Sequence, residues 1–195
     1  AADRWWIPRL AGQRGTDLKE IDEPQEAPII IAGFGRYGQI VGRLLFANGF
    51  SATVLEHDAE QVEAVRRFGW PVYYGDAARL DLLRSAGADS ARLFVLAIDD
   101  VAQSVAVAKL VREHFPRLTI VARARNVSHY YQLRALGIEA VERETLDSAL
   151  MSGRSVLERL GFERHQSRTM ALRFRQHNIE LVEQMRPHFG DEAKL

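Results

Sequence analysis

The chain contains no cysteine among its 195 residues. This absence excludes disulfides, zinc–thiolate centres and thiolate catalysis, and it fits a reducing compartment. The six histidines are scattered without the spacing of metal ligands, so we expect no metal site. The sequence also lacks a serine–histidine–aspartate order, an HExxH motif and a Walker lysine motif. These absences together predict that the chain is not an enzyme and has no catalytic residues.

Long apolar runs and an excess of one charge are missing as well. The longest apolar runs, Ile29–Phe34 and Leu93–Ile98, are far shorter than the roughly 20 residues that span a bilayer, so we expect a soluble chain. Lys+Arg and Asp+Glu both total 26, which gives a formal net charge of zero. Nucleic-acid binders usually have a basic excess. The composition therefore favours an ordinary globular protein that binds no nucleic acid.

From Ile29 onward, short apolar segments alternate with amphipathic ones, and glycine or proline separates them. We predict strands at Ile29–Phe34, Ala52–Asp58, Val72–Gly75, Leu93–Ile98, Thr119–Ala124 and Ala140–Glu142, and helices at Tyr37–Asn48, Glu60–Phe68, Arg79–Ala86, Val101–Phe115 and Ser128–Leu136. This alternation predicts a parallel sheet covered by helices on both faces. The expected fold class is α/β, a Rossmann-type doubly wound parallel sheet with a C-terminal helical extension.

Three segments follow from this pattern. Residues 1–28 have no apolar periodicity and are predicted to be a linker, residues 29–144 form the Rossmann domain, and residues 145–195 form the helical extension. The extension is expected to contain helices at Thr145–Leu160 and Phe162–Met185. A long helix with a thin apolar stripe packs more often on another subunit or domain than on its own core, so we expect the second helix to need a partner surface.

A GxGxxG motif, Gly33–Gly38, lies between the first predicted strand and helix. Gly33 permits the tight turn, Gly35 lets the backbone approach a phosphate, and Gly38 allows close helix–strand packing. The helix N-terminus at Arg36 and Tyr37 offers N–H groups to the anion. Glu56, 18 residues past Gly38, can accept hydrogen bonds from ribose hydroxyls. The alternative is a lapsed site whose glycines serve only the turn.

Further residues follow the third and fourth strands. Asp76 and Ala77 end the third, and Asp99 ends the fourth. The carboxyl ends of strands in such sheets face one crevice, so these residues are expected to border the nucleotide. The alternative is that Asp76 and Asp99 only cap the helices that follow them.

Several segments carry a resemblance to a known family. Ile30–Gln39, the Tyr-Gly-Asp-Ala box at Tyr74–Ala77 and Ala-Arg-Ala-Arg at Ala122–Arg125 resemble the RCK/KTN regulatory domain of glutathione-gated potassium efflux antiporters, the Kef family. The similarity covers nearly all of residues 29–185. This sequence departs from the family at Glu56, where an aspartate is usual, at His177 and at Ala140–Val141.

The resemblance implies a homodimer that regulates a membrane potassium/proton antiporter domain of the same polypeptide, at the cytoplasmic face of the bacterial inner membrane. The implied cofactor is AMP or NAD(H). Glutathione would inhibit efflux and glutathione S-conjugates would activate it. A flavodoxin-like quinone oxidoreductase is the implied ancillary partner.

The resemblance also implies a glutathione pocket at Arg43, Arg143 and Asn178, with Phe68 as an aromatic that responds to bulk on the sulfur. Glutathione carries two carboxylates, and guanidinium groups and an amide suit them. The alternatives are a solvated charge for Arg43, a surface pair with Glu144 for Arg143, and core packing for Phe68. Two other functions remain open, a small NAD-dependent Rossmann oxidoreductase and a nucleotide-gated domain of another potassium channel or transporter.

Overall fold

The computed structural model describes residues 21, 25–66 and 72–189. Phe68 and most of the predicted linker lie outside these residues. The described part alternates strands and helices in the predicted order: β1 (Ile29–Ala32), α1 (Arg36–Ala47), β2 (Thr53–Glu56), α2 (Ala59–Arg66), β3 (Val72–Tyr74), α3 (Leu80–Ser85), β4 (Leu93–Leu96), α4 (Val101–His114), β5 (Thr119–Ala124), α5 (Val127–Ala135), β6 (Ala140–Arg143), α6 (Leu146–Arg159), α7 (Arg164–Met185) and the 3₁₀ turn η1 (Arg186–His188).

The six strands form one sheet in the order β3-β2-β1-β4-β5-β6. Ile31 of β1 is in register with Val54 of β2 on one side and with Val95 of β4 on the other, and both pairings are parallel. The chain moves from β1 outward to β3 and then returns to β4 on the other side of β1. This reversal is the switch point of a doubly wound sheet, and it confirms the predicted Rossmann-type class.

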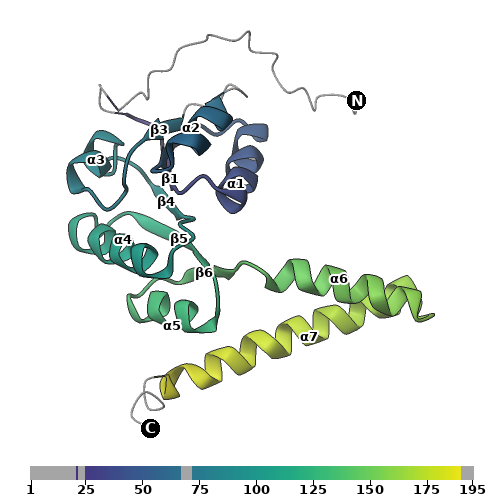
Figure 1. Cartoon of the computed structure of the whole chain (residues 1–195). Coiled ribbons are helices and arrows are strands. Elements are labelled where there is room, and N and C mark those ends of the chain that lie inside the picture. Colours follow the sequence, from purple (N-terminus) through teal and green to yellow (C-terminus); the bar gives the residue numbers. More distant parts are fainter. Residues whose placement is uncertain (1–20, 22–24, 67–71, 190–195) are drawn as a thin grey trace. The chain divides into compact units, whose positions relative to one another are not determined.

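The strands at the switch point are buried on both faces. Ile29 and Ile31 pack with Phe34, and side chains of α1 such as Val41 and Leu45 cover them. Ile30 points to the opposite face, because successive strand residues alternate, and it is fully buried too. Figure 1 shows α1 and α2 on one side of these strands and α3 and α4 on the other. Burial of each such aliphatic side chain contributes about 1.5–3 kcal/mol, which holds β1 firmly behind the loop that follows it.

The chain divides into two compact units. The first comprises residues 1–122 and 138–140, and the second comprises residues 123–137 and 141–195. In the second unit, α6 and α7 lie side by side as a hairpin (Figure 1). Gly161 between them has a φ of +99°, a conformation that favours glycine and reverses the chain there.

Two tyrosines of α5 fasten the end of α7 within the second unit. The Tyr131 hydroxyl donates to the carbonyl of Val182 at 2.8 Å, and its ring centroid lies 4.8 Å from that of Phe189. The Tyr130 hydroxyl donates to Glu183. Burial, with a smaller contribution from Glu183, raises the pKa of Tyr130 to about 12. The neutral phenol is therefore favoured in the folded chain.

Alkaline pH should loosen this attachment. An unfolded tyrosine has a pKa of about 10, so the stabilisation linked to Tyr130 is complete below that pH and is lost as the pH rises toward about 12. Thermal unfolding of the wild type and of Tyr130→Phe across this range tests the expectation. The wild type should lose more stability than the variant, and parallel losses would contradict the assignment.

Candidate functional site

The loop after β1 needs glycine at two positions for reasons internal to the fold. Gly33 has a φ of +88°, and a Cβ there would lie 2.9 Å from the backbone of Ala97. A Cβ at Gly38 would lie 2.2 Å from the Gly33 carbonyl oxygen. These two glycines therefore let β1, α1 and the end of β4 approach one another closely.

Gly35 is different, because the protein itself does not require glycine there. Its φ of −64° and ψ of −166° are extended values that any residue adopts. Among the described residues, a Cβ at Gly35 would meet only the Gln61 Oε1 atom, at an ordinary 3.7 Å. Gly35 is also the N-cap position of α1, which has no side-chain cap hydrogen bond and no acidic residue in its first turn. The space and the positive end of the helix fit a phosphate group at this position.

Glu56 contacts this loop from the end of β2 through the backbone N–H of Phe34. It is the last residue of β2 and is only 4% exposed. Its Oε2 accepts from the Phe34 N–H at 2.6 Å, its Oε1 accepts from the Asp58 N–H at 3.0 Å, and His57 Nδ1 lies 3.1 Å from Oε1. A carboxylate offers about four acceptor positions, so these three contacts leave capacity for a ribose hydroxyl.

The other residues of the predicted nucleotide site have different surroundings. Arg36 is exposed in the first turn of α1, whereas Tyr37 packs against the hydrophobic core. Ala77 is buried. Asp76 Oδ1 accepts from the Ala78 N–H at 2.9 Å and from Gln103 Nε2 at 3.1 Å, so this carboxylate stabilises its own loop and reaches α4.

The cap of α4 is Asp100. Its side chain accepts from the Gln103 N–H at 2.8 Å, which satisfies a donor at the helix N-terminus. Asp99, the residue before it, is exposed. That Asp99 borders the nucleotide stays a prediction. The alternative, that Asp99 caps α4, is wrong, because Asp100 is the cap.

The second unit brings two of the predicted glutathione residues together. Arg143 is the last residue of β6, and its Nη2 donates to Asn178 Oδ1 in the middle of α7. The expected alternative, a surface pair of Arg143 with Glu144, is not what forms. Glu144 instead accepts from Arg123 Nε at 3.0 Å, and Arg123 is only 6% exposed. This partly buried ion pair holds the residue immediately after Arg143.

A second ion pair joins α7, which carries Asn178, to α6. Arg175 Nε lies 2.6 Å from Asp147 Oδ1, which connects α7 to the first turn of α6. The hydrogen bond from Arg175 lowers the pKa of Asp147. Both groups are solvated, so the pair adds little stability, although it joins α7 to α6 about one turn before Asn178.

The other two predicted glutathione residues lie elsewhere in the chain. Arg43 is exposed on α1 of the first unit, and Phe68 lies outside the described residues. A common pocket for all four residues therefore stays a prediction.

The described residues contain neither a candidate metal site nor a membrane-spanning helix. In residues 25–66 and 72–189, no group of three histidine, aspartate or glutamate side chains could hold a metal ion. Within the same part of the chain, every helix is too short or too polar to cross a bilayer.

The family follows from comparison with known proteins. Residues 29–144 match the TrkA-N domain model, and residues 148–195 match the model of the potassium efflux system KefB C-terminal domain. A solved structure of the Shewanella denitrificans Kef CTD in AMP-bound form is 40% identical to this chain and superposes on it with a TM-score of 0.77. The match covers 83% of this chain and 99% of the Shewanella chain. The chain belongs to the TrkA-N family, as a Kef C-terminal regulatory domain.

Two further proteins are similar to this chain over most of its length. The glutathione-regulated potassium-efflux system protein KefC of Escherichia fergusonii is 50% identical over 89% of this chain. The alignment covers 28% of that protein, so this Kef domain spans less than a third of the length of the curated relative. The GsuK RCK domain shares 25% identity over 71% of this chain and 30% of its own, with a TM-score of 0.62.

Two polar residues contact predicted site residues or their neighbours, and their contacts were not predicted from the sequence. Gln103 contacts Asp76, and Arg123 pairs with Glu144. Arg123 carried a usable signal, because a charged residue inside an apolar strand indicates a buried partner. Gln103, in an ordinary amphipathic helix, carried none.

Proposed function

We propose that this Kef domain binds an adenine nucleotide, AMP or NAD(H), in the first unit and senses it without catalysis. The carrying observation is the open position at Gly35, where an uncapped helix N-terminus faces space that the protein leaves unfilled. The buried Glu56 carboxylate beside it supplies the acceptor that ribose hydroxyls need. The AMP-bound state of the 40% identical Kef domain supports the same ligand here.

We further propose that glutathione holds the system closed and that glutathione S-conjugates open it. The name of the E. fergusonii relative describes glutathione regulation of potassium efflux. In this chain, the Arg143 guanidinium is already oriented by the Asn178 amide. A guanidinium fork and an amide suit a peptide ligand with two carboxylates.

We also propose the kind of longer protein to which this domain belongs. A potassium/proton antiporter domain of the same polypeptide would account for the remaining length of the relatives. The regulatory domain would then lie at the cytoplasmic face of the bacterial inner membrane, with a flavodoxin-like quinone oxidoreductase as an ancillary subunit.

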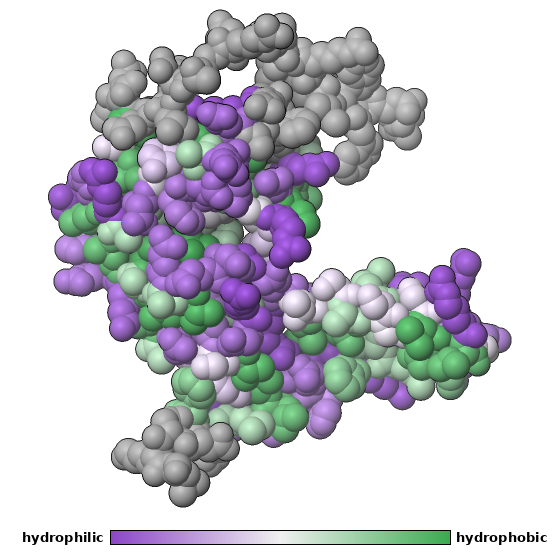
Figure 2. Space-filling view, in the orientation of Figure 1, coloured by the Kyte–Doolittle hydropathy of each residue, from purple (hydrophilic) through white to green (hydrophobic). Residues whose placement is uncertain are grey.

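The α6–α7 hairpin supports a homodimer. In α6 no residue is buried, and Figure 2 shows apolar side chains gathered along the hairpin. Leu160 is 71% exposed and Met151 is 62% exposed. Apolar surface of this kind usually marks an interface, and closed two-fold pairs are the commonest homo-oligomers.

Sedimentation at micromolar protein concentration tests the dimer. We expect the wild type to sediment as a dimer and Leu160→Glu to shift toward the monomer, because the substitution places a charge within the apolar surface. Gln176→Glu, at an exposed polar position of α7, is the matched control and should remain dimeric. A monomeric wild type would refute the proposed dimer.

The experiment that tests the proposed function is a calorimetric titration with glutathione, an S-alkyl glutathione and AMP. We expect saturable binding of all three and mutual competition between glutathione and its conjugate. No ligand should be consumed during the titration. Conversion of a ligand to a product would instead support an enzyme.

A further inference from the structure

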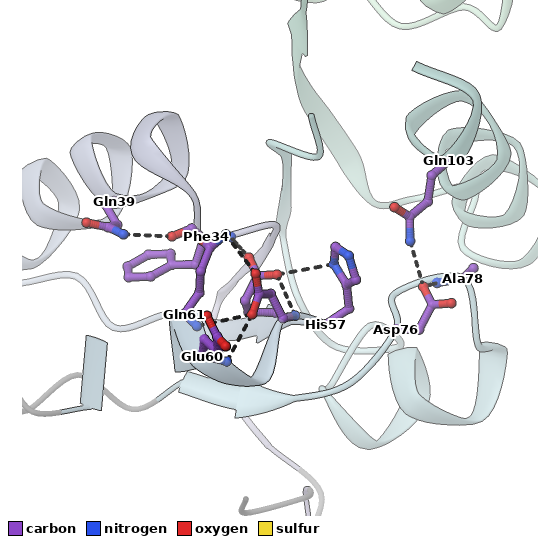
Figure 3. A network of polar contacts seen from close by, with 10 residues as sticks. Phe34, Gln39, His57, Glu60, Gln61, Asp76, Ala78 and Gln103 are labelled. Atoms are coloured by element: carbon purple, nitrogen blue, oxygen red, sulfur yellow. Dashed lines mark hydrogen bonds and ion pairs between the residues drawn. The ribbon is translucent and has the colours of Figure 1, made fainter. Parts of the chain in front are cut away.

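One hydrogen bond in the first unit connects the two halves of the Rossmann fold. Gln103 Nε2, in the first turn of α4, donates to Asp76 Oδ1, in the segment after β3, at 3.1 Å (Figure 3). Both ends of this bond are held in place. The Asp76 oxygen also accepts from the Ala78 N–H at 2.9 Å, and the Gln103 backbone N–H donates to Asp100 at 2.8 Å. The bond therefore links a carboxylate held by its own loop to a residue whose backbone is fixed at the N-terminus of α4.

The sheet order shows what the bond must cross. Strands β3 and β4 are separated by β2 and β1, and neighbouring strands lie about 4.8 Å apart, so their ends are about 14 Å apart. Asp76 follows β3 and Gln103 lies just beyond β4. A direct contact between them has to pass near the carboxyl ends of β2 and β1. Those ends carry Glu56 and the loop Gly33–Gly38, where the nucleotide is proposed to bind.

The two halves joined by this bond take different parts of a dinucleotide. In doubly wound folds of this order, β1–β3 and β4–β6 form two mononucleotide-binding halves, and a dinucleotide lies across the crevice between them. Glu56 and Gly35 both belong to the first half, so an adenosine and its first phosphate would be bound there. A second nucleoside would continue toward the start of α4, where Gln103 lies.

We infer that the Gln103–Asp76 hydrogen bond selects mononucleotides over dinucleotides. This inference rests on the proposed nucleotide site and deepens it. A mononucleotide reaches from Glu56 to Gly35 and leaves the bond intact. A dinucleotide has to break the bond to reach the second half, and the lost hydrogen bond to a carboxylate is subtracted from its affinity. Gln103 is thus a specificity-determining residue.

The test compares the dissociation constants of AMP and NAD⁺ by calorimetry in the wild type, Gln103→Ala and Gln103→Leu. Alanine removes both the donor and the bulk, whereas leucine removes the donor and keeps most of the bulk. Both variants should improve NAD⁺ binding relative to AMP by about tenfold to a hundredfold, the equivalent of one hydrogen bond to a carboxylate. Gln132→Ala, at a glutamine whose amide only reaches Ser128 on its own helix, is the matched control and should leave the ratio unchanged.

Each other result has a definite meaning. An unchanged NAD⁺/AMP ratio in both variants, with unchanged melting temperature, would overturn the inference while leaving the nucleotide site in place. A parallel loss of AMP and NAD⁺ binding would show that Gln103 contacts the shared part of the ligand, which also overturns it. Failure of the wild type to bind either nucleotide would refute the proposed function itself, and the inference with it.

Discussion

Gly35→Val should abolish nucleotide binding and leave the fold intact. The valine side chain would occupy the space in front of the α1 N-terminus, where a Cβ would meet Gln61 Oε1 at 3.7 Å and no other atom of the part of the chain that the structure describes. The backbone of Gly35 is extended, so valine can adopt it without strain. Loss of two charge-assisted hydrogen bonds to phosphate would weaken binding by about a hundredfold or more. Calorimetry with AMP, together with a melting curve, measures both effects.

Two other glycines provide the controls for this experiment. Gly38→Ala should destabilise the chain by about 1–3 kcal/mol, because its Cβ would overlap the Gly33 carbonyl oxygen at 2.2 Å. Gly153→Ala, in an open position of α6, should bind AMP like the wild type and keep its stability or gain slightly. If Gly35→Val retained AMP at wild-type affinity, the phosphate would have to bind elsewhere.

Removal of Arg143 should weaken glutathione binding by about tenfold to a hundredfold. A charge-assisted hydrogen bond is worth about 1.5–3 kcal/mol, and Arg143→Ala would leave a ligand carboxylate without its partner. Arg173→Ala, at an exposed arginine of α7, is the matched control and should bind glutathione normally. Equal losses in Arg143→Ala and Arg173→Ala would indicate a general effect of charge rather than a site.

The contact between Arg143 and Asn178 allows a sharper test, in which the two single variants are compared with the double variant. Because the Asn178 amide accepts from the guanidinium, the two residues should act as one unit. The double variant should lose less affinity than the two single variants predict when their losses are added. Strict additivity would mean that the observed hydrogen bond has no role in the ligand-binding state.

The fold was predictable because its signal is local. The central strands β1 and β4 are short apolar runs, and Gly33 and Gly75 directly follow β1 and β3 where their pairing ends. The first predicted strand extended to Phe34, but β1 ends at Ala32, since the positive φ of Gly33 turns the chain there. Likewise, Asp99 and Asp100 are adjacent residues of the same type, so the sequence alone does not show which of them caps α4. Only the backbone conformation decides that Asp100 is the cap of α4.

The contacts that refine the site were not predictable in this way. Gln103 and Asp76 are 27 residues apart, Arg123 and Glu144 are 21 apart, and Tyr130 and Glu183 are 53 apart. A single sequence contains no periodicity that pairs such positions. Their partners are set by the strand order and by helix packing, which bring distant segments together only after the fold has formed.

Mass spectrometry of the small molecules released from the purified, denatured chain tests the central claim most directly. The loop Gly33–Gly38 and Glu56 predict that an adenine nucleotide co-purifies with the protein, or binds when AMP is added, and is recovered chemically unchanged after incubation. Its loss from Gly35→Val, and not from Gly153→Ala, would place it at this loop. A wild-type chain that carries no nucleotide and takes up none when AMP is supplied would contradict the account.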